Sequence, residues 1–354
     1  FYGTLPFAPG LELDGEDSLS LDKPRETKPP LGRDTLRVAV ARLPRISNFT
    51  DLDPLFHEPG VEVRFTRSAA ELLASDLAVI PGTKATVSDL AWLRSRGMDR
   101  AIPERARRGL PTLGICGGYQ MLGAHITDGV ESDEREAEGL ALLSVETAFE
   151  KEKVLSRPSG ISPAFGGAEV FGYEIRHGRV RRTAGEPLFI VGGGSEEGCL
   201  SGSVLGTSWH GVLESDAFRR ELLGMVVSER GLDWLPGDEP FAFAREARFE
   251  RLADLVADNL DRDALLRLIE GHGRRRSVDG GVSARETPMP EAFAPPGGEV
   301  SEPASPDAHD GSGGNLPLQT VAGANSTLAR PRTERDGVRD TFRQTANERG
   351  KADG

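Results

Sequence analysis

Residues 113–123 read Leu-Gly-Ile-Cys-Gly-Gly-Tyr-Gln-Met-Leu-Gly, and this stretch decides the fold. The apolar residues before Cys116 predict a short buried strand, and those after Gly118 predict a helix. Gly114 and Gly118 lie two residues on either side of Cys116, which is the glycine pattern of a nucleophile elbow. In such an elbow a sharp turn between strand and helix presents a nucleophilic side chain at the edge of a sheet.

Cys116 is therefore predicted to be a catalytic nucleophile. Its place at the start of a helix favours the thiolate, because the positive end of the helix dipole and unpaired N–H groups lie beside the sulfur. Cys199 is the only other cysteine and has no comparable glycine frame. A free cysteine without such a frame is typically a small buried apolar residue, so Cys199 is predicted to be structural.

The sequence around this elbow alternates between short apolar strands and helical patterns. Residues 23–34 form a charged, proline-rich connector, and a helical stretch covers about 88–108 with a break near Gly97. Strands are predicted at residues 36–40, 61–65, 77–80 and 112–115. This order predicts an α/β fold with a mostly parallel sheet, in which ligands bind beyond the carboxyl ends of the strands.

The second half of the chain has a different pattern. Short strands with glycine-rich turns are predicted from about 140 to 212, followed by a helix over 218–227. Two more helices are expected within 241–270, with core positions at Phe249, Leu252, Val256 and Leu260. After residue 271 large apolar residues become scarce, so residues 271–354 are predicted to be a disordered tail.

A cysteine nucleophile needs a base that takes a proton and later delivers it to the leaving amine. Among six histidines, His210 ends an apolar segment and precedes Gly211, which places its imidazole at a strand tip with open approach. His177 is the alternative candidate for this base, and it is interpreted as a pocket or interface residue. Attack on an amide also creates an oxyanion. We predict that the N–H of Gly117 and the turn at Gly82 and Thr83 stabilise this oxyanion.

The elbow resembles the nucleophile motif of class I glutamine amidotransferases, specifically the cobyric acid synthase branch. Further segments resemble that branch in the same order, at residues 77–84, 89–93, 138–143, 171–179 and 206–211. The resemblance spans roughly residues 1–270 and implies a flavodoxin-like, mostly parallel sheet with the nucleophile elbow and short C-terminal helices. It also selects His210 as the base, and it implies that Gly82, Thr83 and Gly117 contribute to glutamine binding.

One position departs from the family pattern. Many class I amidotransferases carry His-x-Glu, whereas residue 212 of this chain is valine. Glu214 is a possible orienting acid for His210, and it is equally compatible with a surface position. The sequence therefore supports a Cys116–His210 dyad and leaves the third member open.

The resemblance implies that this chain is the glutaminase part of a cobyric acid synthase. Such an enzyme uses glutamine, ATP and Mg to amidate carboxylates of adenosylcobyrinic acid a,c-diamide in cobalamin biosynthesis. The chain contains no G-x-x-x-x-G-K-[ST] phosphate loop, so we expect the ATP-using domain and the corrinoid site outside it. The implied domains are 1–34 as the remnant of that domain and linker, 35–230 as the amidotransferase, 231–270 as a helical extension and 271–354 as the tail.

Composition excludes several function classes. The net charge of −13 and the lack of a basic stripe argue against a nucleic-acid partner. Two cysteines without a pairing pattern indicate a reducing compartment, and no apolar run reaches the ~20 residues that span a bilayer, so a cytoplasmic enzyme without a membrane partner is expected. No metal site is expected. Three alternatives stay open: the glutaminase subunit of lipid II isoglutaminyl synthase, a thiol hydrolase on the same fold, and a non-catalytic interaction module.

Overall fold

The structure, a computed structural model, describes residues 3–6, 8, 27–131 and 136–275. Its centre is a six-stranded sheet in the order β13-β14-β4-β3-β1-β2. Five of its strands, β1, β2, β3, β4 and β14, run parallel, and β13 pairs antiparallel with β14. The strands are β1 (Leu36–Ala41), β2 (Val61–Thr66), β3 (Leu77–Ile80), β4 (Thr112–Ile115), β13 (Cys199–Ser201) and β14 (Val204–Thr207). The order β2-β1-β3-β4-β14 is the flavodoxin-like order, which confirms the predicted fold class.

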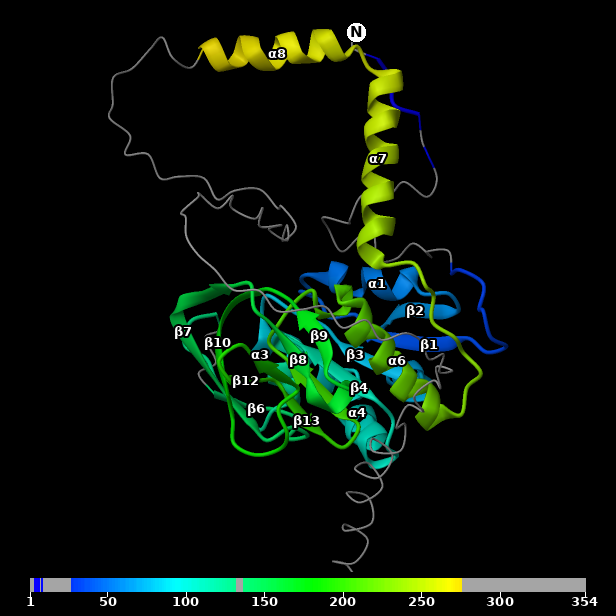
Figure 1. Ribbon diagram of the computed structural model, residues 1–354. Coiled ribbons are helices and arrows are strands. Elements are labelled where there is room, and N and C mark those ends of the chain that lie inside the picture. The colour runs from blue at the N-terminus through cyan, green and yellow to red at the C-terminus, as the bar shows by residue number, and fades with distance from the viewer. Residues whose placement is uncertain (1–2, 7, 9–26, 132–135, 276–354) are drawn as a thin grey trace, which may run out of the picture. The chain divides into compact units, whose positions relative to one another are not determined.

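Helices cover both faces of this sheet (Figure 1). Side chains alternate between the faces along each strand, so Val38 and Val40 pack with α1 and α6 while Ala39 and Ala41 pack on the opposite side. Burial on both faces explains why the strands are continuously apolar rather than alternating. The helices of this unit are α1 (Asp53–His57), α2 (Ala69–Ala74), α3 (Thr86–Ser95), α4 (Met98–Arg107), α5 (Gly117–Leu122), α6 (Asp216–Arg230) and α7 (Phe241–Asn259), with 3₁₀ turns η2 (Phe49–Leu52), η3 (Pro163–Phe165) and η4 (Val212–Glu214).

Two helical predictions are confirmed in detail. The stretch predicted over 88–108 is two helices, α3 and α4, separated at Gly97, whose φ of 71° lies in the left-handed region that favours glycine. The helix predicted over 218–227 lies within α6, and its apolar residues Phe218, Leu222, Leu223 and Val226 are all inaccessible to solvent.

The short strands of the middle region form two further four-stranded sheets, β10-β7-β5-β6 and β12-β11-β8-β9. The first contains β5 (His125–Thr127), β6 (Glu136–Glu138), β7 (Val145–Ser156) and β10 (Glu174–Arg182). The second contains β8 (Ser159–Ser162), β9 (Ala168–Phe171), β11 (Phe189–Val191) and β12 (Glu196–Glu197). Both lie between β4 and β14 in the sequence, so they form an insertion between two adjacent parallel strands of the central sheet.

The prediction of core positions on α7 is wrong. Phe249 and Val256 are each 42% exposed, and Phe241 at the first turn is the only buried residue of the helix. The helical period correctly identified an apolar face, but a period cannot tell whether another element covers that face. The helix α8 (Arg262–Arg275) belongs to a separate compact unit that begins at Asp261. Residues 271–275, predicted as the start of a disordered tail, are instead the last residues of α8, and residues 276–354 lie outside the described residues. The domain boundaries stay a prediction.

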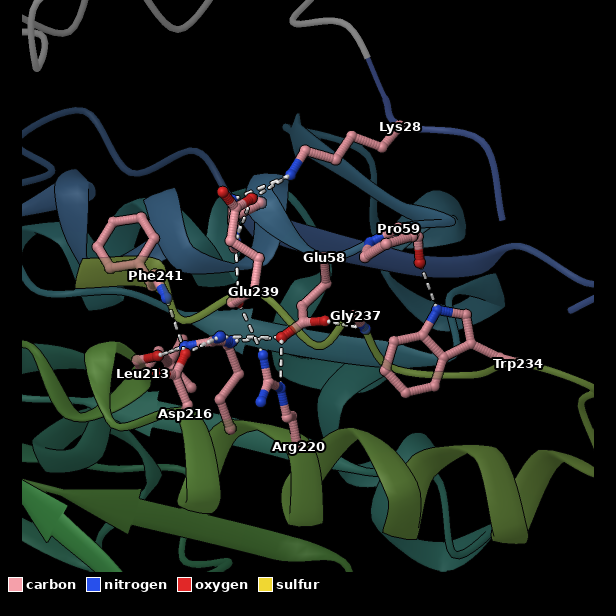
Figure 2. A network of polar contacts seen from close by, with 12 residues as sticks. Lys28, Glu58, Pro59, Leu213, Asp216, Arg220, Trp234, Gly237, Glu239 and Phe241 are labelled. Atoms are coloured by element: carbon pink, nitrogen blue, oxygen red, sulfur yellow. Dashed lines mark hydrogen bonds and ion pairs between the residues drawn. The ribbon is translucent and has the colours of Figure 1, made fainter. Parts of the chain in front are cut away.

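A buried ionic network fixes the start of α6 and α7 to the end of α1 (Figure 2). The guanidinium of Arg219 donates from Nε to Oε1 of Glu58 at 2.9 Å, and both side chains are fully buried. Arg219 Nη1 also donates to the carbonyl of Leu213 at 2.6 Å. The other Glu58 oxygen accepts the backbone N–H of Gly237 at 2.9 Å. This network therefore holds the turn at Leu213, three residues after His210, against the body of the fold.

Replacing Arg219 with leucine is expected to lower the free energy of unfolding by about 3–5 kcal/mol, because it leaves the buried carboxylate of Glu58 without its close partner. Urea unfolding followed by circular dichroism measures the change. Arg220→Leu is the matched control, since Arg220 lies 3.4 Å from the same Glu58 oxygen but is partly exposed. Equal losses in the two variants would contradict the role given to burial.

Candidate active site

Cys116 occupies the turn between β4 and α5. Its backbone has φ 51° and ψ −107°, a conformation that L-residues rarely adopt, and α5 begins at the next residue. A Cβ at position 118 would lie 1.9 Å from the carbonyl oxygen of Ile80, and one at position 114 would lie 2.6 Å from a methyl group of Leu122. Only glycine fits at both positions, which is the physical basis of the pattern that predicted the elbow.

His210 lies just beyond the carboxyl end of β14, the strand next to β4. These strands pair in parallel, and the N–H of Cys116 donates to the carbonyl of Thr207 at 2.8 Å. His210 is 1% exposed, and Cys116 is close enough to be among the groups that raise the pKa of its imidazole. The structure thus brings together the two residues that the sequence predicted as nucleophile and base.

A third residue, Asp51, completes this arrangement, and the sequence analysis missed it. Its Oδ2 lies 2.7 Å from Nδ1 of His210, and its Oδ1 accepts the N–H of Gly211 at 2.8 Å. Asp51 belongs to η2, which follows β1, and it is 3% exposed. The hydrogen bond at Nδ1 leaves Nε2 to face the thiol, so Asp51 fixes the orientation of the ring.

Glu214, the possible orienting acid of the sequence analysis, does not hold that position. The Nδ1 atom of His210 is taken by Asp51, whereas Glu214 Oε2 accepts a hydrogen bond from Arg245 Nη1 at 2.8 Å. Glu214 lies in η4, and the turn at Gly211 separates it from the imidazole ring. Its ion pair instead joins η4 to α7.

The surroundings of His210 favour its protonated form. Burial alone lowers the pKa of His210, but the Asp51 carboxylate and the neighbouring Cys116 outweigh burial and raise that pKa to about 10. A protonated imidazole beside a cysteine favours a thiolate–imidazolium pair, which is the reactive form of a Cys–His site.

An aromatic ring covers the imidazole. Tyr173 stacks on His210 with ring centroids 5.3 Å apart and an angle of 26° between the planes. The hydroxyl of Tyr173 accepts a hydrogen bond from Asn48 Nδ2 at 2.7 Å, and the backbones of Tyr173 and His210 are joined by two hydrogen bonds. This packing restricts the ring to the plane in which it meets both Asp51 and Cys116.

The three residues predicted to surround the oxyanion lie next to one another. A Cβ at position 117 would be 3.2 Å from the backbone N of Thr83, and one at position 82 would be 2.9 Å from Cε1 of His210. The N–H of Gly117 is in the first turn of α5, where a helix has no internal acceptor for it. Among the described residues, the N–H of Thr83 also has no acceptor. The geometry is compatible with a pair of donors, whose role as an oxyanion hole stays a prediction.

His177 lies apart from this arrangement. It belongs to β10, and its Nδ1 atom is 2.9 Å from the carbonyl oxygen of Glu150 on the paired strand β7. Within the part of the chain that the structure describes, no group of three or more metal-ligating side chains is found, and no helix is long and apolar enough to cross a membrane.

His210→Ala is expected to reduce glutamine hydrolysis by roughly 10²–10⁴-fold, because it removes the group that moves the proton. His177→Ala is the matched control and should retain most of the activity. Release of ammonia from glutamine measures both. Similar losses in the two variants would leave the choice of His210 over His177 as the base unsupported. A larger loss in His177→Ala would identify His177 as the base.

Comparison with known proteins agrees with this geometry. Residues 37–218 match the CobB/CobQ-like glutamine amidotransferase domain. The chain is 48% identical over 275 residues to a cobyric acid synthase of Streptomyces avermitilis, covering 76% of this chain and 53% of the relative. It is 49% identical over 268 residues to that of Rhodococcus jostii, covering 74% of this chain and 52% of the relative. A solved glutamine amidotransferase aligns with a TM-score of 0.43 at 21% identity, over 55% of this chain and 99% of its own.

The chain spans about half the length of the curated relatives that it matches. The matched domain covers about half of the chain and includes Asp51, Cys116 and His210. The chain therefore belongs to the CobB/CobQ-like glutamine amidotransferase family.

Proposed function

We propose that Cys116, His210 and Asp51 hydrolyse the side-chain amide of glutamine and release ammonia. The observation that carries this proposal is the buried Asp51–His210 hydrogen bond next to a cysteine on a strained elbow. The Cys116 thiolate attacks the amide carbon, and the N–H groups of Gly117 and Thr83 stabilise the oxyanion. His210 donates its proton to the departing ammonia. Water then attacks the thioester, His210 accepts the proton of that water, and glutamate leaves as the thiolate forms again.

We propose that the released ammonia amidates a corrinoid substrate. We infer that this chain is the glutaminase portion of a cobyric acid synthase, which amidates side-chain carboxylates of adenosylcobyrinic acid a,c-diamide. Support comes from identities of 48–49% to proteins of that name, about half of whose length this chain covers. The ATP, the Mg and the corrinoid would be bound by the portion of the relatives that the chain does not match. A cytoplasmic location fits such a biosynthetic reaction.

A chimera tests the proposal. This chain replaces the matched portion of the Streptomyces avermitilis relative, and the enzyme receives the corrinoid diamide, ATP, Mg and glutamine labelled with ¹⁵N in its side-chain amide. Mass spectrometry should find ¹⁵N in the amidated corrinoid. The Cys116→Ser chimera is the control, because it should use free ammonia but not glutamine.

Three outcomes would count against this function. Glutamine hydrolysis without labelled corrinoid would favour a thiol hydrolase. Labelling of a lipid II carboxylate by the chain with a matching ligase would favour the isoglutaminyl synthase alternative. A chimera with Cys116 intact that uses free ammonia but not glutamine would favour the non-catalytic interaction module, since the elbow would then have no chemical role.

A further inference from the structure

The turn at Gly82 and Thr83 belongs to no helix or strand, so its position depends on contacts with other segments. One of these segments is the loop at residues 45–47, whose Ser47 N–H donates to the carbonyl of Gly82 at 2.9 Å. The same loop leads into η2, which carries Asp51. An N–H group stabilises an oxyanion only if it is already aimed at the place where the charge develops. Whatever fixes this turn therefore also aims the N–H of Thr83.

A single carboxylate oxygen of Asp89 joins the turn to this loop. Oδ2 of Asp89 accepts the hydroxyl of Thr83 at 2.6 Å and the backbone N–H of Arg45 at 3.1 Å. The hydroxyl also lies 3.0 Å from the carbonyl oxygen of Arg45, but it has one proton, and the shorter contact with a carboxylate is the stronger hydrogen bond. Asp89 itself is in the first turn of α3, where its N–H donates to the carbonyl of Ala85 at 3.0 Å. The helix thus holds both loops through one atom.

The other oxygen of Asp89 is in an unfavourable environment. Asp89 is fully buried, and its Oδ1 accepts no hydrogen bond within the part of the chain that the structure describes. The guanidinium of Arg45 lies 3.8 Å from this oxygen, on a side chain that is largely exposed. Burial raises the pKa of Asp89, although the hydrogen bonds from Thr83 and Arg45 oppose that shift. A buried carboxylate with one unsatisfied oxygen destabilises a fold, so stability does not explain this aspartate.

The turn that Asp89 holds lies directly against the elbow. A Cβ at position 117 would be 2.7 Å from Cγ2 of Thr83 and 3.2 Å from its backbone N, and residue 117 follows the nucleophile Cys116. A change in the side-chain torsion of Thr83 would therefore also shift its backbone relative to the first turn of α5. The hydrogen bond from the Thr83 hydroxyl to Asp89 opposes that change.

We propose that Asp89 is a positioning residue for the hydrolysis of glutamine, and that it aims the N–H of Thr83 at the oxyanion by holding the Thr83 hydroxyl. The inference rests on the proposed glutaminase function. Asp89 acts through Thr83 and moves no proton, because proton transfer belongs to His210. Its removal should therefore slow the steps that form and collapse an oxyanion, and should leave glutamine binding and the reactivity of the Cys116 thiolate unchanged.

Asp89→Ala, measured in the chimera, should lower kcat for glutamine hydrolysis by roughly 10- to 100-fold and leave KM nearly unchanged. Asp89→Asn keeps one oxygen for the two donors and should restore most of this loss. Asp128→Ala is the matched control, since Asp128 is also buried, its Oδ1 accepts two backbone N–H groups, and its Oδ2 has no partner among the described residues. Asp128 follows β5, outside the site, so its loss should lower stability and leave kcat unchanged.

Thr83→Val tests the same hydrogen bond from its other end, and it decides the matter if Asp89→Ala does not fold. Valine keeps the shape of threonine and removes the hydroxyl, so kcat should again fall with KM nearly unchanged. In the double variant of Asp89→Ala and Thr83→Val the two losses should not add, because both remove one interaction.

Alkylation by iodoacetamide separates the oxyanion from the nucleophile. The thiolate displaces iodide from this reagent without forming an oxyanion. Cys116 should therefore be alkylated in Asp89→Ala and Thr83→Val at the rate of the wild type, whereas His210→Ala should react slowly. Peptide mass spectrometry measures the rate at Cys116.

Three results would overturn the inference and leave the proposed function standing. They are a wild-type kcat in Asp89→Ala or in Thr83→Val, a loss in Asp89→Asn equal to that in Asp89→Ala, and a fall in alkylation of Cys116 that parallels the fall in hydrolysis. The last result would place the effect on the nucleophile or on the fold instead of the oxyanion. No hydrolysis of glutamine by the wild type, alone or in the chimera, would overturn both the inference and the proposed function.

Discussion

Cys116→Ser is expected to lower glutamine hydrolysis by on the order of 10⁴-fold or more, while the fold stays intact. A serine hydroxyl is not ionised at neutral pH, so His210 beside it cannot form the reactive pair that a thiol forms. The substitution is nearly isosteric, and the strained backbone at this position is set by Gly114 and Gly118 rather than by the sulfur. Ammonia release measures activity, and circular dichroism with thermal unfolding measures the fold.

The second cysteine provides the control for this experiment. Cys199 is fully buried in β13, and its thiol contacts the carbonyl of Ala184 at 3.6 Å, away from the elbow. Cys199→Ala should therefore keep its turnover. A diazoketone analogue of glutamine should label Cys116 alone, as read by peptide mass spectrometry. Retained turnover in Cys116→Ser, or labelling at Cys199, would contradict the assignment of the nucleophile.

The sequence predicted the elbow because the chemistry of an elbow is local. Two glycines and a cysteine within five residues specify a turn that other residues cannot form, and the atoms that exclude a Cβ at Gly118 are in the neighbouring strand. The parallel sheet was predictable for a related reason, since strands buried on both faces have continuous apolar runs. In both cases the pattern along the chain and the structure have the same physical cause.

Asp51 could not be found in the same way, because it is 159 residues from His210 in the sequence. The sequence offered Glu214 instead, which is close to His210 along the chain but lies beyond the turn at Gly211. The signal that could have identified Asp51 was its position in the fold. Asp51 follows β1 at the carboxyl edge of the sheet, where β3, β4 and β14 place the turn at Gly82, Cys116 and His210. A polar residue after any strand of a parallel sheet deserves consideration as a partner in the site.

Asp51→Asn is expected to lower turnover by roughly 10²–10⁴-fold. Asparagine still offers an oxygen to the N–H of Gly211, but it removes the charge beside Nδ1 of His210 and introduces an amide donor there. The imidazole then loses the partner that keeps its proton on Nδ1. The pKa of His210 should fall from about 10 toward its ordinary range, which NMR of the ring can follow.

This substitution also predicts a pH-dependent change in stability. Because the folded-state pKa of His210 is raised, its ion pair with Asp51 contributes fully below the unfolded pKa near 6.5 and is lost as the pH rises through about 10. The unfolding free energies of wild type and Asp51→Asn should therefore differ most near pH 6 and converge toward pH 10. Urea unfolding across this range measures the difference.

Glu214→Gln is the matched control for Asp51→Asn, since both replace a carboxylate near His210 by an amide. It removes the charge that pairs with Arg245 and leaves Nδ1 of His210 bonded to Asp51, so turnover and the histidine pKa should stay close to those of the wild type. The opposite result, with activity lost in Glu214→Gln and kept in Asp51→Asn, would show that Glu214 is the acid that orients His210. Activity could also be lost in both variants while the pKa of His210 falls only in Asp51→Asn. That result would still identify Asp51 as the partner of the imidazole, and it would give Glu214 the structural role of holding η4 against α7.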